Sequence, residues 1–312
     1  MEQRHRLGRP LHHGDTIGIV APSAPVDPER YEKGVAFLQQ LGYTVVHGAS
    51  VMAQRGFLAG PAELRADDIN SFFADDAIDA ILCARGGYGA AQLLDLLDFD
   101  MIRHHSKLFI GFSDITALHV ALYEKAGLAT VHGPMATSFA GKEAPFTRDA
   151  FARGLAQGCP DTVAMPEGTV LDVLYPGKAE GNLVGTNLSL LTSLTGTPYG
   201  LKGTGEILVI EEIGEEAYAI ARMLLQLEQS GLIRRVSGIV FGEFTNCPPA
   251  EECHDDFTVR QVCEYYAERW QVPTLWGLPA GHGPVNTWMP LGLKAAFDSD
   301  DDRCAIQYVK EE

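Results

Sequence analysis

A serine stands where one apolar segment ends and a helical pattern begins. The segment over residues 107–112 is followed by Ser113 and Asp114, and an apolar run with helical spacing starts at Ile115. A serine at a tight strand-to-helix turn exposes its hydroxyl group, and the N–H of the next residue is available to an oxyanion. The pattern indicates a nucleophile for acyl transfer. It departs from Gly-x-Ser-x-Gly because Ile115 replaces the second glycine, and a serine or aspartate that only caps the helix would give the same sequence.

A cluster of glycines follows another apolar segment and also opens a helical pattern. It reads Arg85-Gly86-Gly87-Tyr88-Gly89. Consecutive glycines let backbone N–H groups approach a ligand closely, which suits an oxyanion hole or a phosphate cradle, and a plain tight turn is the alternative. Neither the dinucleotide-binding spacing of glycines nor a Gly-Lys-Ser/Thr phosphate loop is present.

Two further positions could assist a nucleophile. An apolar segment ends in the paired acids Glu211 and Glu212, and His282 lies between two glycines in a loop. A carboxylate at a strand end can orient a histidine, although acids there also cap the following helix. Flanking glycines give the backbone room to direct an imidazole into a cleft, although an ordinary turn histidine has such neighbours too.

Metal sites are weakly indicated. Cys247, Cys253, His254 and Cys263 lie close together, but their spacing lacks the short Cys-x-x-Cys clip of structural zinc sites. The acidic run over residues 298–302 lacks the glycine and the terminal glutamate of a calcium loop, and a hairpin turn explains it better. We therefore expect no metal site.

The elements that must position these residues form an α/β pattern. Short apolar segments alternate with helical segments in the first half, which predicts a doubly wound, mostly parallel sheet whose ligands lie at the carboxyl ends of the strands. The expected strands cover residues 16–21, 44–47, 77–84, 107–112 and 129–132, and the expected helices residues 29–41, 61–73, 90–97 and 115–126.

Glycines and prolines interrupt the periodicity after residue 153, which predicts a linker over residues 154–180. The chain then divides into an N-terminal domain over residues 1–153 and a smaller, mixed α/β C-terminal domain over residues 181–312. The strands expected in the second domain cover residues 206–211, 238–243, 274–277, 293–298 and 304–309, and its helices residues 187–194, 216–229 and 257–270.

The composition and charge of the chain limit the classes of partner that it is expected to bind. The chain has 312 residues and a formal net charge of −17 at pH 7. This charge disfavours nucleic acid and anionic membrane surfaces as partners. Apolar runs are far shorter than a membrane span, the N-terminus leads into no signal sequence, and six scattered cysteines indicate no disulfide framework, so we expect a cytoplasmic protein.

Taken together, these motifs resemble one family in their order and spacing. The chain is similar to the muramoyltetrapeptide L,D-carboxypeptidases, serine peptidases whose family also includes the microcin C self-immunity peptidases. The resemblance extends from residues 14–23 to residues 290–292, with Gly185-Thr186-Asn187 where the family commonly has Gly-Gly-Asn. It rests on residues 85–89, 111–114, 181–188, 210–212 and 281–283.

The resemblance implies a Ser–His–Glu triad made of Ser113, His282 and Glu211. The family pattern uses the first acid of the pair, and alternation along a strand sends Glu211 and Glu212 to opposite faces. The resemblance also implies an activity, the removal of the terminal D-Ala of murein tetrapeptides during peptidoglycan recycling. The enzyme would be a cytoplasmic homodimer without a metal or an organic cofactor.

Acyl-transfer chemistry then assigns an oxyanion hole to the N–H of Asp114 and that of Gly86 or Gly87. Arg85 is a candidate for binding the substrate's free carboxylate.

Two other functions stay open. The microcin branch cleaves peptidyl-nucleotide conjugates and carries a longer loop with aromatic residues for the nucleobase, whereas residues 196–205 here are short and contain only Tyr199. The glycine turns of a doubly wound sheet could instead bind a nucleotide or a sugar without catalysis.

Overall fold

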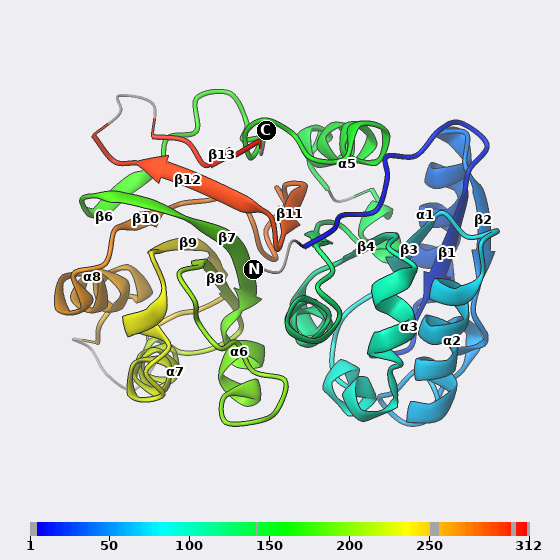
Figure 1. The fold of residues 1–312 in the computed structure, drawn as a ribbon, viewed down its shortest axis with the longest axis horizontal. Coiled ribbons are helices and arrows are strands. Elements are labelled where there is room, and N and C mark those ends of the chain that lie inside the picture. The colour runs from blue at the N-terminus through cyan, green and yellow to red at the C-terminus, as the bar shows by residue number, and fades with distance from the viewer. Residues whose placement is uncertain (1–4, 142, 250–255, 301–303, 311–312) are drawn as a thin grey trace.

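Two β-sheets form the two halves of the protein (Figure 1). We describe a computed structural model, in which residues 5–141, 143–249, 256–300 and 304–310 are defined. The first sheet lies at the right of Figure 1 and the second at the left. A bilayer-spanning helix is not found among the described residues, because none combines the necessary length with an apolar composition.

The first sheet has the strand order β11-β5-β4-β3-β1-β2. All neighbours pair in parallel except β11, which is antiparallel to β5. This order confirms the doubly wound sheet and reverses between β1 and β3, the kind of switch point at which such sheets bind ligands. The strands are β1 (Thr16–Val20), β2 (Thr44–His47), β3 (Ala80–Cys83), β4 (Leu108–Gly111), β5 (Thr130–His132) and β11 (Met289–Leu291).

Helices cover both faces of this sheet, as near-continuous apolar strands require. Ile17 and Ile19 of β1 share one core with Phe37 and Phe151, from the helices α1 (Pro28–Gln40) and α5 (Pro145–Gln157). Side chains on the opposite face pack against three other helices, α2 (Ala62–Ala74), α3 (Phe99–His104) and α4 (Thr116–Ala121).

The second sheet contains both parallel and antiparallel strands, a detail that the predicted mixed α/β domain left open, and has the order β13-β12-β7-β8-β9-β10-β6. The strands from β7 to β10 run parallel, and the outer ones are antiparallel. Its strands are β6 (Asp172–Tyr175), β7 (Lys178–Asn187), β8 (Ile207–Ile213), β9 (Gly238–Thr245), β10 (Thr274–Trp276), β12 (Lys294–Asp298) and β13 (Gln307–Tyr308). Its helices are α6 (Leu188–Leu194), α7 (Ala217–Gln229) and α8 (Val259–Trp270).

The segment over residues 154–180 contains regular structure. It holds the end of α5, strand β6 and the first residues of β7. Strand β7 has little sequence signal because glycines interrupt it. Gly181 is nevertheless required there, since a Cβ atom on it would lie 1.9 Å from the carbonyl oxygen of Gly205. The division into two domains at these residues stays a prediction.

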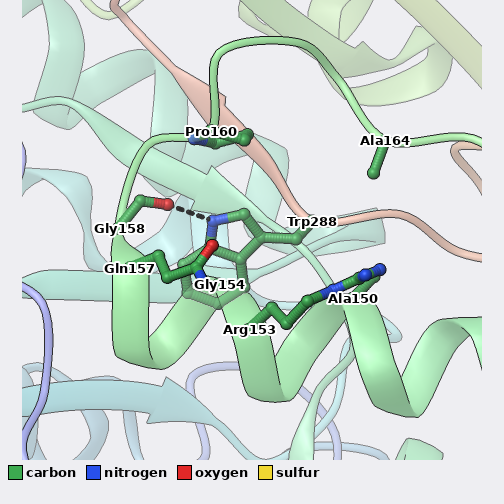
Figure 2. A pocket seen from close by; sticks show the side chains of 8 residues that line it. All are labelled: Ala150, Arg153, Gly154, Gln157, Gly158, Pro160, Ala164 and Trp288. Carbon is green, nitrogen blue, oxygen red and sulfur yellow. Dashed lines mark hydrogen bonds between the residues drawn. The ribbon is translucent and has the colours of Figure 1, made fainter.

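The C-terminal part of the chain returns to the first half. Trp288 precedes β11 and packs on α5, where a Cβ atom on Gly154 would lie 2.1 Å from the indole ring. The indole N–H donates a hydrogen bond to the carbonyl oxygen of Gly158, at an N–O distance of 2.8 Å (Figure 2). A shallow hollow of about 210 Å³ lies beside this contact. The contact fastens the segment that follows His282 to the N-terminal half.

Helix α4 lies between the two halves. All six of its residues are buried, and one continuous core contains Leu118 of α4, Phe109 of the first sheet and Leu208 of the second. The turn that begins at Ser113 leads directly into this helix. Its position is therefore fixed by packing against both sheets.

Two buried histidines stay neutral in this core. The imidazole of His119 contacts the carbonyl oxygen of Gly111 at 3.0 Å, and burial lowers its pKa to about 4. His132 ends β5 and bonds through its two ring nitrogens to Thr186 and Asn286, at 3.1 and 2.8 Å. Burial lowers the pKa of His132 to about 3, and the hydrogen bond to Asn286 opposes this shift.

Mild acid should therefore destabilise the fold. In the unfolded chain both imidazoles titrate near the ordinary pKa of 6.5, so their contribution is complete above that pH and is lost as the pH falls toward the folded-state values. Lowering the pH from 7 to 5 should cost roughly 2 kcal/mol for each histidine. Urea unfolding at the two pH values measures this cost, and His119→Gln should reduce it. An unchanged free energy of unfolding would contradict the prediction.

Candidate active site

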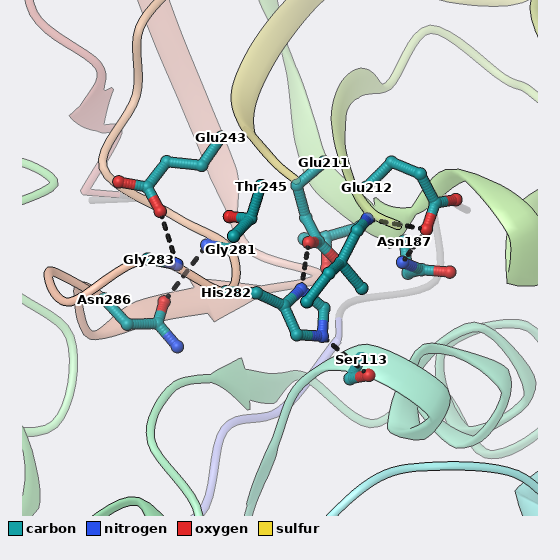
Figure 3. Close-up of polar contacts among 12 residues, drawn as sticks. Ser113, Asn187, Glu211, Glu212, Glu243, Thr245, Gly281, His282, Gly283 and Asn286 are labelled. Atoms are coloured by element: carbon teal, nitrogen blue, oxygen red, sulfur yellow. Dashed lines mark hydrogen bonds and ion pairs between the residues drawn. The ribbon is translucent and has the colours of Figure 1, made fainter. Parts of the chain in front are cut away.

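Ser113, His282 and Glu211 form a continuous hydrogen-bonded chain. The Oγ atom of Ser113 lies 2.9 Å from Nε2 of His282, and Nδ1 of His282 lies 2.8 Å from Oε2 of Glu211 (Figure 3). Ser113 follows β4 of the first sheet, whereas Glu211 belongs to β8 of the second and His282 to the loop before β11. The three residues that the sequence singled out thus meet between the two halves.

The backbone of Ser113 has the left-handed conformation that side-chain-bearing residues rarely adopt, with φ of +66°. Such strain is found at functional sites, and in a strand-to-helix turn it raises the hydroxyl group above the end of the sheet. Gly111 permits the turn, because a Cβ atom there would lie 2.9 Å from the side chain of Ile115. The isoleucine that departs from the expected motif therefore packs against the motif's first glycine.

Strand alternation separates the two acids of β8. The odd-numbered Ile207 and Val209 face one core of the second sheet, and Leu208 and Ile210 face the other. Glu211 accordingly points toward His282, and Glu212 points toward α6.

Glu212 holds the start of helix α6. Its carboxylate accepts hydrogen bonds from the N–H of Ser189 at 2.7 Å, the N–H of Ile213 at 2.8 Å and the side chain of Asn187 at 3.1 Å. Anionic groups stabilise the first turn of a helix, so this arrangement is a cap. Glu212 makes no hydrogen bond to His282.

The carboxylate of Glu211 is fully buried and has few partners. Oε1 has no hydrogen-bond partner among the described residues, so the contact with His282 is the main one. Burial raises the pKa of Glu211, and the hydrogen bond and charge of His282 oppose this shift. The ionised carboxylate of Glu211 is poorly solvated, so it favours the tautomer of His282 that carries a proton on Nδ1. The same carboxylate can stabilise the imidazolium form of His282.

The glycine cluster after β3 lies against the serine turn. A Cβ atom on Gly86 would lie 3.0 Å from Cβ of Ser113, 3.1 Å from its Oγ and 3.4 Å from the backbone nitrogen of Asp114. The next residue, Gly87, has a φ of +119°. The structure therefore brings together the two backbone segments in which the sequence predicts oxyanion donors.

The side chain of Asp114, for which the sequence suggested only a helix cap, connects these segments. Its Oδ2 accepts hydrogen bonds from the hydroxyl of Ser23 at 2.5 Å and from the N–H of Ala90 at 2.8 Å. Burial raises the pKa of Asp114, and these bonds and the nearby Arg65 oppose the shift. Arg65 is itself buried and donates to the carbonyl oxygen of Gly89 at 2.9 Å. Ser23 closely follows β1, so the rule that functional residues lie at strand ends is the one sequence feature that could have pointed to it.

Arg85 lies beside the Gly87 turn. Its guanidinium group is half-buried and donates to the carbonyl oxygen of Pro25 at 3.2 Å. The group is thus near the glycine segment, with one known partner in the backbone.

Among the described residues, no group of three or more histidines, cysteines or acids is arranged so that it could hold a metal ion. Cys253 and His254 lie outside the described residues. The thiol of Cys263 is buried, which raises its pKa.

Comparison with known proteins extends this description. Residues 17–133 match the model of the LD-carboxypeptidase N-terminal domain, and residues 180–297 match that of the C-terminal domain. The chain is 40% identical over 299 residues to the probable murein peptide carboxypeptidase of Bacillus subtilis strain 168. The aligned region covers 95% of this chain and 93% of the relative.

Solved structures of related proteins match the fold of this protein over nearly the whole chain. The muramoyltetrapeptide carboxypeptidase of Oxalobacter formigenes matches with a TM-score of 0.82 and 28% identity, over 95% of this chain and 99% of that one. MccF in complex with glutamyl sulfamoyl guanosine matches with a TM-score of 0.87 and 27% identity, over 97% and 98%.

Family membership disfavours the alternative of a binding module without catalysis. With both domain models matched in order and a relative at 40% identity over nearly its full length, the chain belongs to the LD-carboxypeptidase family and is a serine-type carboxypeptidase.

Proposed function

We propose that this protein releases the terminal D-Ala of murein tetrapeptides with Ser113 as nucleophile, His282 as general base and Glu211 as the acid that orients it. The unbroken hydrogen-bonded chain from Ser113 through His282 to Glu211, with distances of 2.9 and 2.8 Å, is the observation that carries the proposal. Names of the relatives supply the substrate class, since one is called a probable murein peptide carboxypeptidase and another a muramoyltetrapeptide carboxypeptidase.

In the first step, Oγ of Ser113 attacks the carbonyl carbon of the bond before D-Ala. Nε2 of His282 takes the hydroxyl proton and then gives it to the leaving amine, so D-Ala departs and an ester to Ser113 remains. Glu211 stabilises the imidazolium between these transfers because its buried carboxylate faces Nδ1. In the second step, His282 deprotonates a water molecule that attacks the ester, and Ser113 recovers its proton.

The tetrahedral intermediate of each step carries a negative oxygen. In this proposal the N–H of Asp114 and that of Gly86 or Gly87 stabilise it, and each donor of this kind is worth about 2.7 to 4 kcal/mol. The proximity of Gly86 to Oγ of Ser113 supports this role. The Asp114 carboxylate would keep the two donors at a fixed spacing, because it binds Ala90 at the end of the glycine segment. Arg85 is the proposed partner of the substrate's terminal carboxylate.

A peptidyl-nucleotide conjugate is the second candidate substrate. It is favoured by the high structural similarity to MccF in its complex with glutamyl sulfamoyl guanosine. Against it, Tyr199 is engaged elsewhere, since its hydroxyl donates to Asp95 and its ring packs near Phe99, with centroids 6.2 Å apart. The cell-wall peptide is therefore the preferred substrate. A cytoplasmic location and a homodimer remain parts of the proposal.

The experiment that tests the proposal follows D-Ala released from a panel of murein tetrapeptides, beside hydrolysis of a peptidyl-adenylate. We expect turnover of at least one tetrapeptide and a loss of more than about 10⁴-fold in kcat for Ser113→Ala. Because triad residues act as a unit, adding His282→Ala to that variant should cost little more. Full activity of Ser113→Ala with an intact fold would refute the serine mechanism, and turnover of the adenylate alone would favour the second substrate.

Substitution of the two acids of β8 by glutamine should have opposite effects on kcat and on stability. Glu211→Gln should lower kcat by about 10³-fold through misorientation of His282, with no loss of stability at pH 7, because its raised pKa makes the buried charge a cost to folding. Glu212→Gln should leave kcat within about tenfold and lower stability by about 1 kcal/mol through the weakened cap of α6. Steady-state kinetics and urea unfolding of both variants measure this, and a reversed ranking in kcat would assign the acid to Glu212.

A methyl group on Gly86 should interfere with the oxyanion. Gly86→Ala brings a Cβ atom within 3.1 Å of the nucleophile, so we expect kcat to fall by about 10²-fold while KM changes little. Gly133→Ala is the matched control, since a Cβ atom there would meet no atom closer than 3.7 Å. Equal kinetics of the two variants would remove the 86–87 segment from the oxyanion hole.

A further inference from the structure

The loop that carries His282 is held on both sides of the histidine. The N–H of Gly283 donates to Oε2 of Glu243 at 2.6 Å, and the N–H of Gly281 donates to Oδ1 of Asn286 at 3.3 Å (Figure 3). Glu243 lies on β9, the strand beside the one that carries Glu211. One anchor therefore comes from the second sheet and the other from the loop itself.

Asn286, which binds the N–H of Gly281, is itself held by two residues of the N-terminal half, His132 at the end of β5 and Thr147 of α5. Asn286 Oδ1 also lies 2.8 Å from Nε2 of His132, and the backbone N–H of Asn286 donates to the hydroxyl of Thr147 at 2.9 Å. Asn286 is thus tied to the N-terminal half, as is Pro284, whose carbonyl oxygen accepts from the N–H of Ala144 at 2.9 Å. The backbone N–H of Glu243 donates to the carbonyl oxygen of Ala280 at 3.0 Å, and its side chain ties Gly283 to the second sheet, which also carries Glu211.

The glycines beside His282 are shaped around Glu243. A Cβ atom on Gly283 would lie 1.9 Å from Oε2 of Glu243, although the backbone of Gly283 does not have a positive φ. A Cβ atom on Gly281 would lie 3.0 Å from Cβ of Glu243. A side chain at position 283 would therefore displace the carboxylate of Glu243 from its present place.

Two charged groups of the site, Glu211 and His282, act on this carboxylate. Burial raises the pKa of Glu243, the charge of Glu211 raises it further, and the Gly283 N–H and His282 oppose the shift. No ion pair among the described residues includes Glu243. A half-buried acid next to another acid is costly, and the hydrogen bond that this carboxylate accepts within the described part of the chain comes from the backbone beside the proposed base.

We propose that Glu243 is a positioning residue for His282, whose carboxylate holds residues 281–283 so that the imidazole reaches both Ser113 and Glu211. This inference rests on the proposed serine mechanism and deepens it. The carboxylate acts through the backbone N–H of Gly283, and what matters is an acceptor oxygen at that place. Glutamine keeps such an oxygen and alanine does not.

Kinetics on a murein tetrapeptide test the role. Glu243→Ala should lower kcat by about 30-fold with KM within twofold, and Glu243→Gln should keep kcat within about threefold of the native enzyme. Glu264→Ala, an exposed acid on α8 that pairs with Arg260, is the control and should have native kinetics. Native kcat for Glu243→Ala, or equal losses for the alanine and glutamine variants, would overturn the proposal.

A spectroscopic measurement separates this inference from the reaction itself. The Nδ1 proton of His282, held by Glu211, should give a low-field proton resonance that is absent in His282→Gln. We expect that resonance to be lost or broadened in Glu243→Ala and retained in Glu243→Gln. An unchanged resonance in the alanine variant refutes the positioning role whether or not any tetrapeptide is hydrolysed. A native enzyme that turns over no tetrapeptide refutes the proposed function instead.

Gly283→Ala tests the same contact even if Glu243→Ala does not fold. It places a Cβ atom on the Glu243 carboxylate and should lower kcat to a similar extent, by about 30-fold. Where Glu243→Ala does fold, it can be combined with Gly283→Ala. In the double variant the clash is gone, so activity should be no lower than in Glu243→Ala alone. Native kcat in Gly283→Ala, or additive losses in the double variant, would contradict the contact as the means of positioning.

Discussion

The contact between Oγ of Ser113 and Nε2 of His282 spans two β-sheets, and much of the architecture can be understood as the means of keeping it at 2.9 Å. A hydrogen bond of this kind weakens over a few tenths of an ångström, whereas the two halves of a protein can shift by more than that. Two features oppose such a shift. Helix α4 is buried between the sheets, and β11 joins the first sheet only a few residues after His282.

Asp114 shows how one residue can serve both the geometry and the proposed chemistry of the site. Its backbone N–H is a proposed oxyanion donor, and its side chain binds Ser23 after β1 and Ala90 after β3. The ends of three neighbouring strands are therefore connected through one buried carboxylate. Burial of such a group is tolerated because each of its bonds compensates part of the lost hydration.

The sequence predicted those parts whose signal is local. Parallel strands buried on both faces are continuous apolar segments, so most strands of the first sheet were found, and the rule that ligands lie at strand ends led to Ser113, Gly86 and Glu211. The choice of Glu211 over Glu212 needed the family pattern in addition to strand alternation. Their side chains do diverge in the structure, one toward His282 and one toward α6.

The parts that escaped prediction depend on contacts between distant residues. Strand β7 contains Gly181 because a neighbouring backbone approaches closely, and β11 is three residues long with a proline at its centre. Asn286 and His132 are 154 positions apart in the sequence, so nothing local indicates that they meet. Glu243 ends a predicted strand and was within reach of the strand-end rule, but no motif identified it.

The pairing of β11 with β5 also bears on how the chain is made. A ribosome delivers the N-terminal end first, so β1 to β5 emerge long before residues 289–291 do. Until then β5 is an edge strand with unpaired N–H and C=O groups, a surface on which other chains can aggregate. Completion of the first sheet must wait until residues 289–291 have been made, and these lie only a few residues after the histidine. The strand that completes the first sheet and the histidine of the site thus belong to one late-synthesised segment of the chain.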